Sequence, residues 1–316
     1  MNIIIAGSTD ISTYILSRLL KEYRKNIKLI ITQPDKKAGR GQKIGINSLK
    51  KIGIENNIEI IQPEKINSEE SVNYLKNFTP AIFIIIAYGQ ILSDEIINIF
   101  NNNCINIHFS LLPDLRGPTP VETAILKGYK KTGITIQRIN KEVDAGDIIL
   151  QKEIEIDENI TAGELFEKMK EPAAQLLFEF LEKFEKGEIN YYKQNNNLAT
   201  YTKKIKKEDG KINWNDLRIN IHNKIRAYNP KPLAYTFYKK KYLKIYKSNL
   251  QFENMIYNNN DLKNGIIILK NKQLFVKAID GFIELLELQL ESGKKLNAID
   301  FINGQRIKSG EDFFND

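Results

Sequence analysis

The sequence NIHFSLLPDLRG, residues 106–117, joins the end of an apolar run to a loop that contains Pro113. We expect a strand to end at Ile107 and the rigid loop Ser110–Pro113 to follow at once. Loops at the carboxyl ends of strands are where α/β sheets bind their ligands. The stretch therefore predicts an α/β fold with a ligand site at this loop.

Apolar runs on both sides of this stretch predict the rest of the sheet. They lie at residues 2–6, 28–32, 58–61, 82–87 and 105–107. Near-continuous apolar runs of this kind are typical of a parallel sheet that helices cover on both faces. After the first run, a turn at residues 7–10 and a helical pattern follow, but there is no Gly-x-Gly-x-x-Gly. A dinucleotide site is therefore not expected.

The second half of the chain changes character. Thr161 and Glu164 have the spacing of a capping box, so we expect a helix that begins there, kinks or restarts near Pro172 and ends about Gly187. Residues 188–199 are polar and rich in Asn, which predicts a linker. Beyond the linker, short runs at residues 266–270, 273–278 and 282–290 alternate with turn residues and predict a mainly β domain.

Asn106, His108 and Asp144 carry the functional groups of an acyl-transfer site. His108 is one of only two histidines, and Asp144 follows in the sequence VDAGD. An amide, an imidazole and a carboxylate can hold a carbonyl, stabilise an oxyanion and take a proton from an attacking amine. Taken singly, His108 also fits a structural role and Asp144 an ordinary turn. The occurrence of all three residues together with the Ser110–Pro113 loop favours a site that transfers a one-carbon acyl group.

The net charge of +8 is concentrated in residues 200–247. This segment holds 12 Lys and 2 Arg against 3 acidic residues, a net charge of +11, so the remaining 268 residues carry −3. The aromatic residues among its lysines are Tyr228, Tyr235, Phe237, Tyr238 and Tyr242. Such a mixture is typical of a nucleic-acid surface. A solvated lysine-rich face, in a chain that uses Lys, Ile and Asn throughout, is the alternative, and composition leaves both open.

The cysteine and histidine content limits the other functions. One cysteine, Cys104, and no N-terminal signal pattern lead us to expect a cytoplasmic protein in which Cys104 is a small buried residue. The longest apolar stretch, residues 81–87, is far below the roughly 18 residues that span a bilayer, so no membrane role is expected. One cysteine and two distant histidines do not make a zinc site, and no metal is expected.

Several motifs together resemble the folate-dependent formyltransferase family. Besides the catalytic strings they are residues 32–41 (TQPDKKAGRG), 87–90 (AYGQ), 225–230 (IRAYNP) and 288–294 (LQLESGK), so the resemblance covers most of the chain. The catalytic string is specific to the family, and the other motifs favour its branch that modifies tRNA. The resemblance implies a Rossmann-like formyltransferase domain with a mainly parallel sheet at residues 1–188, a basic linker at 189–207 and a small OB-like β-barrel that binds tRNA at 208–316.

The resemblance also implies a reaction and its residues. The formyl group of 10-formyltetrahydrofolate would pass to the α-amino group of methionine on charged initiator tRNA, with Asn106, His108 and Asp144 as catalytic residues and no metal. The folate would contact Ser110, Leu111, Leu112 and Pro113 together with Tyr88, Gly89, Gln90, Ile91 and Leu92. The tRNA would contact Lys36, Lys37, Arg40 and Lys43 together with Lys203, Lys204, Lys206 and Lys207. A monomer is expected.

The chain departs from the family pattern at two positions, and other functions stay open. Ser8-Thr9 follows Gly7 where relatives usually have Thr-Pro, and Lys231 stands where they usually have Trp. A formyltransferase for a small amine, such as glycinamide ribonucleotide or a nucleotide-linked amino sugar, explains the first 190 residues equally well. A non-catalytic RNA-binding relative is the third possibility, against which the complete trio argues. The basic C-terminal half favours the tRNA-directed enzyme.

Overall fold

The chain divides into two compact units. The structure is a computed structural model that describes residues 1–38, 43–45, 47–101, 103–250 and 262–313. The N-terminal unit comprises residues 1–120, 132–155 and 166–202, and the C-terminal unit comprises residues 121–131, 156–165 and 203–316. The C-terminal unit thus takes two short segments from the first half of the chain. The predicted domain boundaries after residues 188 and 207 stay predictions.

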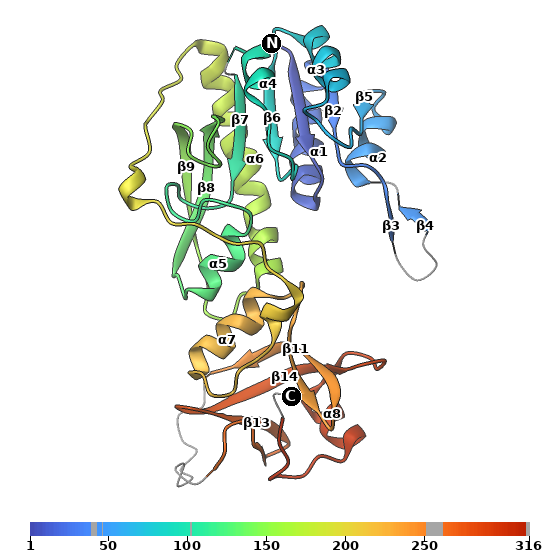
Figure 1. Ribbon diagram of the computed structural model, residues 1–316, viewed down its shortest axis with the longest axis vertical. Coiled ribbons are helices and arrows are strands. Elements are labelled where there is room, and N and C mark those ends of the chain that lie inside the picture. The colour runs from blue at the N-terminus through green and yellow to red at the C-terminus, as the bar shows by residue number, and fades with distance from the viewer. Residues whose placement is uncertain (39–42, 46, 102, 251–261, 314–316) are drawn as a thin grey trace. The chain divides into compact units, whose positions relative to one another are not determined.

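A seven-stranded sheet forms the centre of the N-terminal unit (Figure 1). Its order is β5-β2-β1-β6-β7-β8-β9, and its strands are β1 Ile3–Gly7, β2 Ile27–Ile31, β5 Glu59–Ile61, β6 Ile82–Ile86, β7 Cys104–His108, β8 Lys131–Arg138 and β9 Ile148–Glu155. The first five strands in this order pair in parallel, whereas β8 runs antiparallel to β7. A small hairpin, β3 Lys36–Ala38 and β4 Lys43–Gly45, lies outside this sheet. The predicted Rossmann-like, mainly parallel sheet is confirmed.

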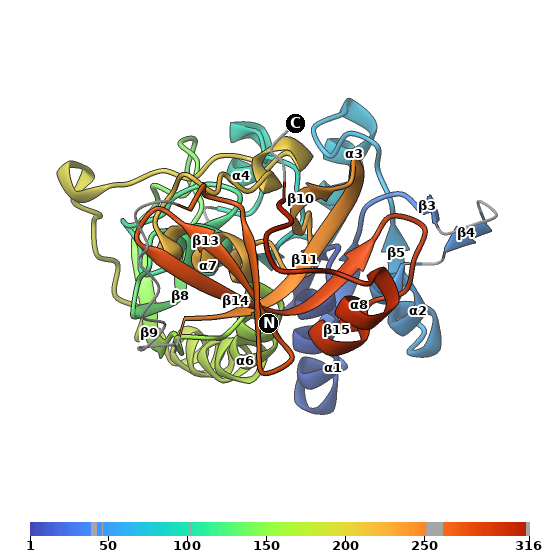
Figure 2. The same ribbon diagram turned by 90° about the horizontal axis from the view of Figure 1, so that it is seen from below.

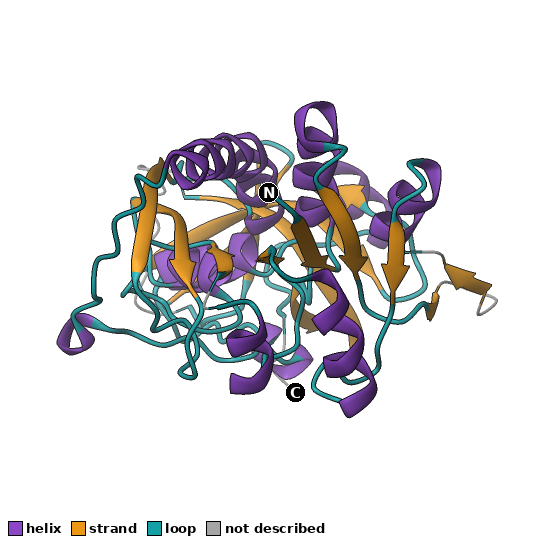
Figure 3. Ribbon diagram, turned by 90° about the horizontal axis from the view of Figure 1, so that it is seen from above, coloured by secondary structure: helices purple, strands orange, loops and turns teal. Residues whose placement is uncertain are grey.

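Helices cover both faces of this sheet, as Figure 3 shows. They are α1 Asp10–Tyr23, α2 Ser48–Glu55, α3 Glu69–Leu75, the 3-10 turn η1 Lys76–Phe78, α4 Asp94–Ile99 and α6 Ala162–Lys186, whereas α5 Pro120–Leu126 belongs almost entirely to the C-terminal unit. Helices α3 and α4 share an apolar core with Ile4, Leu29 and Phe83. On the other face α1 contacts α6, where the Tyr14 hydroxyl donates to Glu171 at 2.6 Å. Burial on both faces explains why β1 and β6 are apolar throughout.

The turn after β1 depends on the absence of a side chain at Gly7. A Cβ there would lie 2.5 Å from the Cβ of Ser12 and 2.9 Å from the carbonyl oxygen of Ile86. The backbone N–H of Thr9 donates to the Ser12 hydroxyl at 2.9 Å and begins α1. Glycine is therefore required here for close packing between β1, α1 and β6.

Helix α6 begins where the sequence predicts. The Thr161 backbone N–H donates to the Glu164 carboxylate at 2.9 Å, and the Glu164 N–H donates back to the Thr161 hydroxyl at 3.3 Å. This reciprocal pair is a capping box. The helix continues through Pro172 to Lys186 without a second start, and Gly187 follows with φ +71.

An antiparallel sheet organises the C-terminal unit (Figure 2). Its strands follow the order β10-β11-β14-β13-β12, with β15 on β14: β10 Ala234–Tyr238, β11 Lys241–Asn249, β12 Ile267–Lys270, β13 Gln273–Ala278, β14 Gly281–Leu290 and β15 Leu296–Asn297. The helices are η3 Lys207–Gly210, α7 Arg218–Ala227 and α8 Ala298–Gln305, while η2 Asn196–Leu198 belongs to the N-terminal unit. The predicted mainly β domain is confirmed, and its sheet is consistent with a small barrel.

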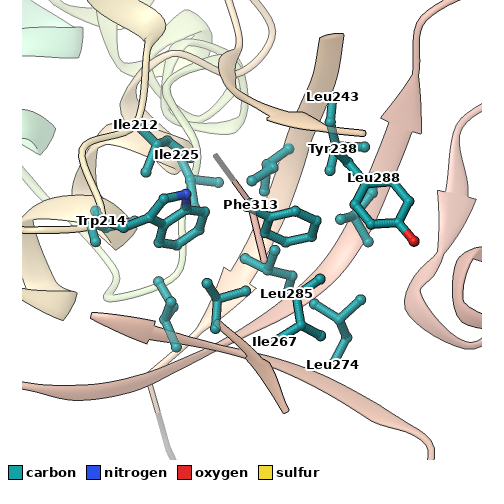
Figure 4. Close-up of a cluster of buried hydrophobic side chains, with 14 of the residues drawn as sticks. Ile212, Trp214, Ile225, Tyr238, Leu243, Ile267, Leu274, Leu285, Leu288 and Phe313 are labelled. Atoms are coloured by element: carbon teal, nitrogen blue, oxygen red, sulfur yellow. The ribbon is translucent and has the colours of Figure 1, made fainter. Parts of the chain in front are cut away.

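Aromatic side chains fill the core of this sheet (Figure 4). Trp214 is fully buried, stacks on Phe313 with ring centroids 6.0 Å apart, and donates from its indole N–H to Thr236 at 3.1 Å. Tyr238 keeps its ring in the core while its hydroxyl points outward and donates to Glu311 at 2.5 Å. Trp214 is thus a core residue and not a surface for stacking.

Two sequence expectations concern single features. Cys104 is buried in β7, and burial raises the pKa of its thiol to about 12, so it remains an inert apolar side chain. In the part of the chain that the structure describes, no helix is both long enough and apolar enough to cross a membrane.

Candidate active site

Strand β7 presents Asn106 and His108 on the same face, because side chains two residues apart in a strand point the same way. In the antiparallel pair with β8, Asn106 lies opposite Gln137 and His108 opposite Thr135. Gln137 therefore stands beside Asn106. The sequence analysis missed Gln137, because its role follows from the register of β8, a strand that no apolar run announces.

The carboxylate of Asp144 accepts hydrogen bonds from several polar groups of this region. Its Oδ1 accepts from the Gln137 side-chain amide at 2.9 Å and from Asn106 at 3.4 Å, and its Oδ2 accepts from the backbone N–H of Gly117 at 2.8 Å. The Nδ1 of His108 lies 3.6 Å from the same Oδ1. The structure thus brings the three sequence-predicted catalytic residues together, although Asp144 comes from the loop between β8 and β9.

His108 is nearly buried, and its orientation is fixed by the main chain. Its Nε2 lies 3.0 Å from the carbonyl oxygen of Leu115, which can only accept. The proton of Nε2 therefore points at Leu115, and Nδ1 is the ring atom that faces Asp144. The imidazole can exchange a proton with the carboxylate or its surroundings only through Nδ1.

The loop after β7 is pinned beneath the site. The Thr135 hydroxyl donates to the Ser110 carbonyl at 2.6 Å and accepts from the Leu112 N–H at 3.2 Å. Gln151 on β9 donates to the Leu112 carbonyl at 2.9 Å. Ser110 and Leu112 are buried, whereas Leu111 and Pro113 are partly exposed. The loop predicted to contact the folate is therefore held rigidly from β8 and β9.

Residues 87–92 leave the sheet at the same edge. They follow β6, whose Ile85 pairs with Asn106 in β7. Ala87 and Gly89 have φ 47 and 85, and Ile91 is 67% exposed. Tyr88 and Leu92 instead point into the core. Of the side chains predicted to bind folate here, Ile91 is the one placed to contact a ligand, while Tyr88 supports the turn.

Tyr88 combines deep burial with an unusual polar group. Burial raises the pKa of its hydroxyl to about 12, and that hydroxyl has no hydrogen-bond partner among the residues that the structure describes. Its backbone carbonyl accepts from the Gln33 side chain at 2.9 Å, which ties the turn to the end of β2. Gln90 also faces the protein, where its side chain accepts from the Ile66 N–H at 2.8 Å.

The segment predicted as a linker lies against the catalytic loops. Gln194 donates to the carbonyls of Asp144 and Gly146 at 2.9 and 2.7 Å, and it accepts from the guanidinium of Arg116. Thr200 and Thr202 pair with the backbone of residues 115–119. Sequence periodicity does not predict these contacts, because they come from an extended segment that pairs with loops.

The two cavities of about 340 Å³ lie away from this constellation. One is lined by residues 148–151 and 188–192, and the other lies in the C-terminal unit beside His222 and Arg226. The candidate site is therefore defined by the convergence of side chains on Asp144. Among the described residues, no group of three or more His, Cys, Asp or Glu side chains could hold a metal ion.

The residues predicted to bind RNA fall into two groups. Lys36, Lys37 and Lys43 lie on the hairpin strands β3 and β4, and Arg40 falls outside the described residues. Lys203, Lys204, Lys206 and Lys207 are all exposed. The second group therefore forms a cationic surface at the start of the long C-terminal segment.

The surrounding aromatic residues divide by burial. Tyr228 and Tyr238 belong to the core. Tyr235 and Tyr242 stack with centroids 4.4 Å apart on the outer face of β10 and β11, and Lys207 lies over the Tyr242 ring at 5.3 Å. Only part of the interspersed aromatic set is therefore near the surface.

Part of the positive charge is also internal. Arg226 is buried and hydrogen-bonds to Asn223, and burial lowers the pKa of both Arg226 and Lys224. The Lys224 ammonium donates to the Lys211 carbonyl at 2.9 Å. The count of +11 therefore overstates the charge available to a nucleic acid.

Comparisons with known proteins match both halves of the chain. Residues 1–181 match the family model described as formyl transferase, and residues 204–306 match the model of the formyl transferase C-terminal domain. The chain is 39% identical over 314 residues to the methionyl-tRNA formyltransferase of Caldicellulosiruptor saccharolyticus, covering 98% of this chain and 99% of the relative. It is 37% identical over 312 residues to that of Clostridium tetani, covering 98% of each.

Solved structures extend the comparison. The fold is similar to WlaRD, a sugar 3N-formyl transferase crystallised in the presence of dTDP and 5-N-formyl-THF, with a TM-score of 0.69 and 26% identity over 93% of this chain and 99% of that one. That match includes most of the C-terminal unit. The presence of a C-terminal domain therefore does not by itself identify the acceptor.

Proposed function

Because the chain belongs to the methionyl-tRNA formyltransferase family, we propose that it transfers the formyl group of 10-formyltetrahydrofolate to the α-amino group of methionyl initiator tRNA, which gives formylmethionyl-tRNA. The observation that carries the proposal is the convergence of Asn106, His108, Gln137 and the Gly117 N–H on the carboxylate of Asp144. Sequence identity of 37–39% over nearly the full length of relatives named for this reaction supports the choice of acceptor.

Asp144 acts as the proton acceptor. A free α-amino group has a pKa of about 7.7 to 8.0, so a sizeable fraction is neutral near pH 7.5 and needs orientation more than deprotonation. When the amine nitrogen bonds to the formyl carbon, it becomes positively charged and must lose a proton. Asp144 takes this proton, directly or through one water, while its three donors hold the carboxylate in place.

Asn106 and His108 stabilise the charge that grows on the formyl oxygen. The Asn106 amide makes only a 3.4 Å contact to Asp144, so it can turn to the oxyanion at little cost. His108 can donate only from Nδ1, since Nε2 is engaged by Leu115, and this role requires its imidazolium form. Each donor contributes on the order of 3 kcal/mol to transition-state stabilisation. Collapse of the intermediate then breaks the bond between the formyl carbon and N10, and N10 takes up a proton, which Asp144 can return, so that tetrahydrofolate is released.

The formyl donor lies along the edge where β6 and β7 end. The exposed Ile91 and the backbone of Ala87 and Gly89 offer one wall, and the pinned loop Ser110–Pro113 offers the other. Positive φ at residues 87 and 89 turns the main chain toward this edge, where its polar groups can meet the pterin. This arrangement presents the formyl carbon to Asn106 and His108.

The tRNA contacts the lysine tetrad, defined as Lys203, Lys204, Lys206 and Lys207. These exposed lysines follow directly after Thr202, which pairs with the loop around Arg116. Phosphates bound there would lie on the same continuous segment that reaches the catalytic loops. Neutralising phosphates releases counterions, so this binding is salt-dependent. The sequence segment from Lys36 to Lys43, which includes Arg40, is proposed to contact the acceptor end.

Two variants test the proposal in the reaction itself. Asp144→Asn keeps the size of the side chain and removes the proton acceptor, whereas Glu142→Gln changes an exposed carboxylate in the same loop. We expect Asp144→Asn to lose at least about a hundredfold in the rate of formyl transfer to charged initiator tRNA, and Glu142→Gln to keep the wild-type rate. Unchanged transfer by Asp144→Asn would contradict the proposed site.

A further inference from the structure

Arg116 is a buried cation whose partners are all neutral. Its exposed fraction is 2%. Its Nε and Nη2 donate to the side-chain oxygen of Gln194 at 3.0 and 2.7 Å, Nη2 also donates to Asn196 at 2.8 Å, and Nη1 donates to the Tyr201 hydroxyl at 3.3 Å. Burying a guanidinium is unfavourable unless it is well hydrogen-bonded. A buried Arg116 that spends its donors on one short segment points to a role beyond packing.

Gln194 links the Arg116 guanidinium to the loop that carries Asp144. While its oxygen accepts from Arg116, its nitrogen donates to the carbonyls of Asp144 and Gly146 at 2.9 and 2.7 Å. Asp144 has φ 52, the left-handed region that non-glycine residues rarely adopt. The Gln194 amide therefore holds the main chain of Asp144 in the conformation that aims its carboxylate at Asn106.

The opposite side of this loop is fixed by strand β8. A Cβ on Gly146 would lie 1.6 Å from the carbonyl oxygen of Arg138, so the loop packs directly on the strand. The Arg138 N–H donates to the Asp147 carbonyl at 2.9 Å. The loop is thus held between β8, where the Arg138 side chain also pairs with the Asp147 carboxylate, and the Gln194 side chain.

The contacts close into a ring around Asp144. The Gly117 N–H, one peptide bond beyond Arg116, donates to the Asp144 carboxylate at 2.8 Å, while the Arg116 side chain reaches the Asp144 carbonyl through Gln194. The carboxylate and the backbone carbonyl of Asp144 are therefore both held by one continuous network of hydrogen bonds. Thr200 and Thr202 fix Arg116 in turn, through backbone bonds of 2.8 Å on each side.

We infer that Gln194 and Arg116 are positioning residues for formyl transfer, which orient the carboxylate of Asp144 without touching either substrate. The inference rests on the proposed role of Asp144. It makes Gln194, Thr200 and Thr202, which the sequence marks only as part of a linker, structural parts of the active site. The reaction rate should therefore depend on a segment that carries none of the catalytic groups.

Substitutions at Gln194 test this role. Gln194→Glu keeps an acceptor for Arg116 but replaces the hydrogen bonds donated to Asp144, Gly146 and Gln137 by repulsion between oxygens, and Gln194→Leu removes all of these bonds. We expect kcat with charged initiator tRNA to fall between about tenfold and a hundredfold in both, because a displaced acceptor misaligns the reaction. The KM values for both substrates should stay within about twofold, since Gln194 contacts neither.

Two further variants bracket the result. Arg116→Lys keeps the charge and one donor, so it should lose less than Gln194→Leu, and its effect should not add to that of Gln194→Glu. Asn197→Ala changes an exposed side chain in the same segment and should match wild type. Unchanged tRNA affinity shows which variants are folded. If Gln194→Leu does not fold, Gln194→Glu provides the test.

Each alternative outcome is distinguishable. A kcat within twofold of wild type in a folded Gln194 variant, while Asp144→Asn is inactive, would overturn the positioning role and leave the proposed function intact. A raised KM with unchanged kcat would instead make Gln194 a binding residue and also overturn the inference. Full activity of Asp144→Asn would overturn the proposed function and the inference together.

Discussion

Asp144 shows how a carboxylate can be held in place by neutral donors. Three neutral donors reach its carboxylate, from the strand residues Asn106 and Gln137 and from the Gly117 main chain. Neutral donors orient an anion while leaving it able to accept a proton. A lysine or arginine in the same place would hold the negative charge more tightly and oppose protonation.

Asn106 offers the clearest residue-scale test of oxyanion stabilisation. We predict that Asn106→Ala lowers kcat by about a hundredfold to a thousandfold, because one donor to the developing charge is lost. Asn103→Ala, at the residue that precedes the same strand, should leave kcat unchanged. Single-turnover formyl transfer at saturating substrates measures both, and a loss confined to KM would show that Asn106 binds the ground state only.

His222 gives a pH-dependent prediction for stability. Burial lowers the pKa of its imidazole below the unfolded value, and the ring is bonded to Ser248 at 2.9 Å and to the Glu158 carbonyl at 3.1 Å. The folded state therefore binds fewer protons than the unfolded state in this range. Its stabilising contribution is present above the unfolded pKa of about 6.5 and is lost as the pH falls toward the folded pKa.

Urea unfolding of wild type and His222→Gln measures this effect. Between pH 7.5 and 5.5 the free energy of unfolding should fall more steeply in wild type, with an excess slope of up to about 1.4 kcal/mol per pH unit. Glutamine does not titrate, so contributions from all other groups cancel in the comparison. Parallel pH profiles of the two proteins would show that His222 does not titrate differently on folding.

Residues that carry recognisable chemistry could be predicted from the sequence, and their supporting residues could not. Asn106, His108 and Asp144 stood out by type and motif, and the structure brings them together. Gln137 and Gln194 did not, because a glutamine has no chemistry that marks it as functional. Their roles arise from the register of β8 and from an extended segment, both set by tertiary packing.

Helix α6 depends at its start on one capping hydroxyl. We predict that Thr161→Ala destabilises the protein by about 1 kcal/mol, because the Glu164 N–H loses its acceptor. Thr161→Ser keeps the hydroxyl and should recover most of this loss. The free energy of unfolding from urea titration separates the two variants, and equal stability of alanine and serine would show that the cap contributes nothing.

Elements with continuous apolar runs were predictable, and amphipathic ones were not. Strands β1, β6 and β13 lie where the sequence placed them, since both faces of the first two are buried. Strands β8 and β9 carry polar residues such as Gln137 and Gln151 that face the site, which breaks the apolar pattern. Polar residues that serve the site therefore make these two strands hard to predict from apolar periodicity.

The lysine tetrad gives a prediction at the scale of a segment. Replacing Lys203, Lys204, Lys206 and Lys207 with alanine should weaken tRNA affinity and reduce the slope of log K against log salt, because fewer counterions are released. The control changes four exposed lysines elsewhere in the C-terminal unit by the same charge: Lys263, Lys272, Lys294 and Lys308. Filter binding between 50 and 200 mM salt, roughly the range over which such contacts respond, measures both. Equal slopes for the two variants would restore the solvated-face alternative.

At the scale of the whole molecule, neither unit alone identifies the acceptor. The N-terminal unit carries the formyl-transfer chemistry, and a sugar formyltransferase shares the fold over 93% of this chain. What separates the tRNA-directed function is identity of 35–39% with curated relatives along both units, together with the lysine tetrad. Composition alone had left a lysine-rich surface and an RNA surface equally open.

The most direct measurement is transfer of labelled formyl from 10-formyltetrahydrofolate to methionyl initiator tRNA, run beside glycinamide ribonucleotide, a nucleotide-linked amino sugar and uncharged initiator tRNA. We predict that label appears only on the charged tRNA, in a product whose amino group is blocked. Formylation of either small amine with none on the charged tRNA would contradict the proposed acceptor, and binding of tRNA without any transfer would contradict the enzyme.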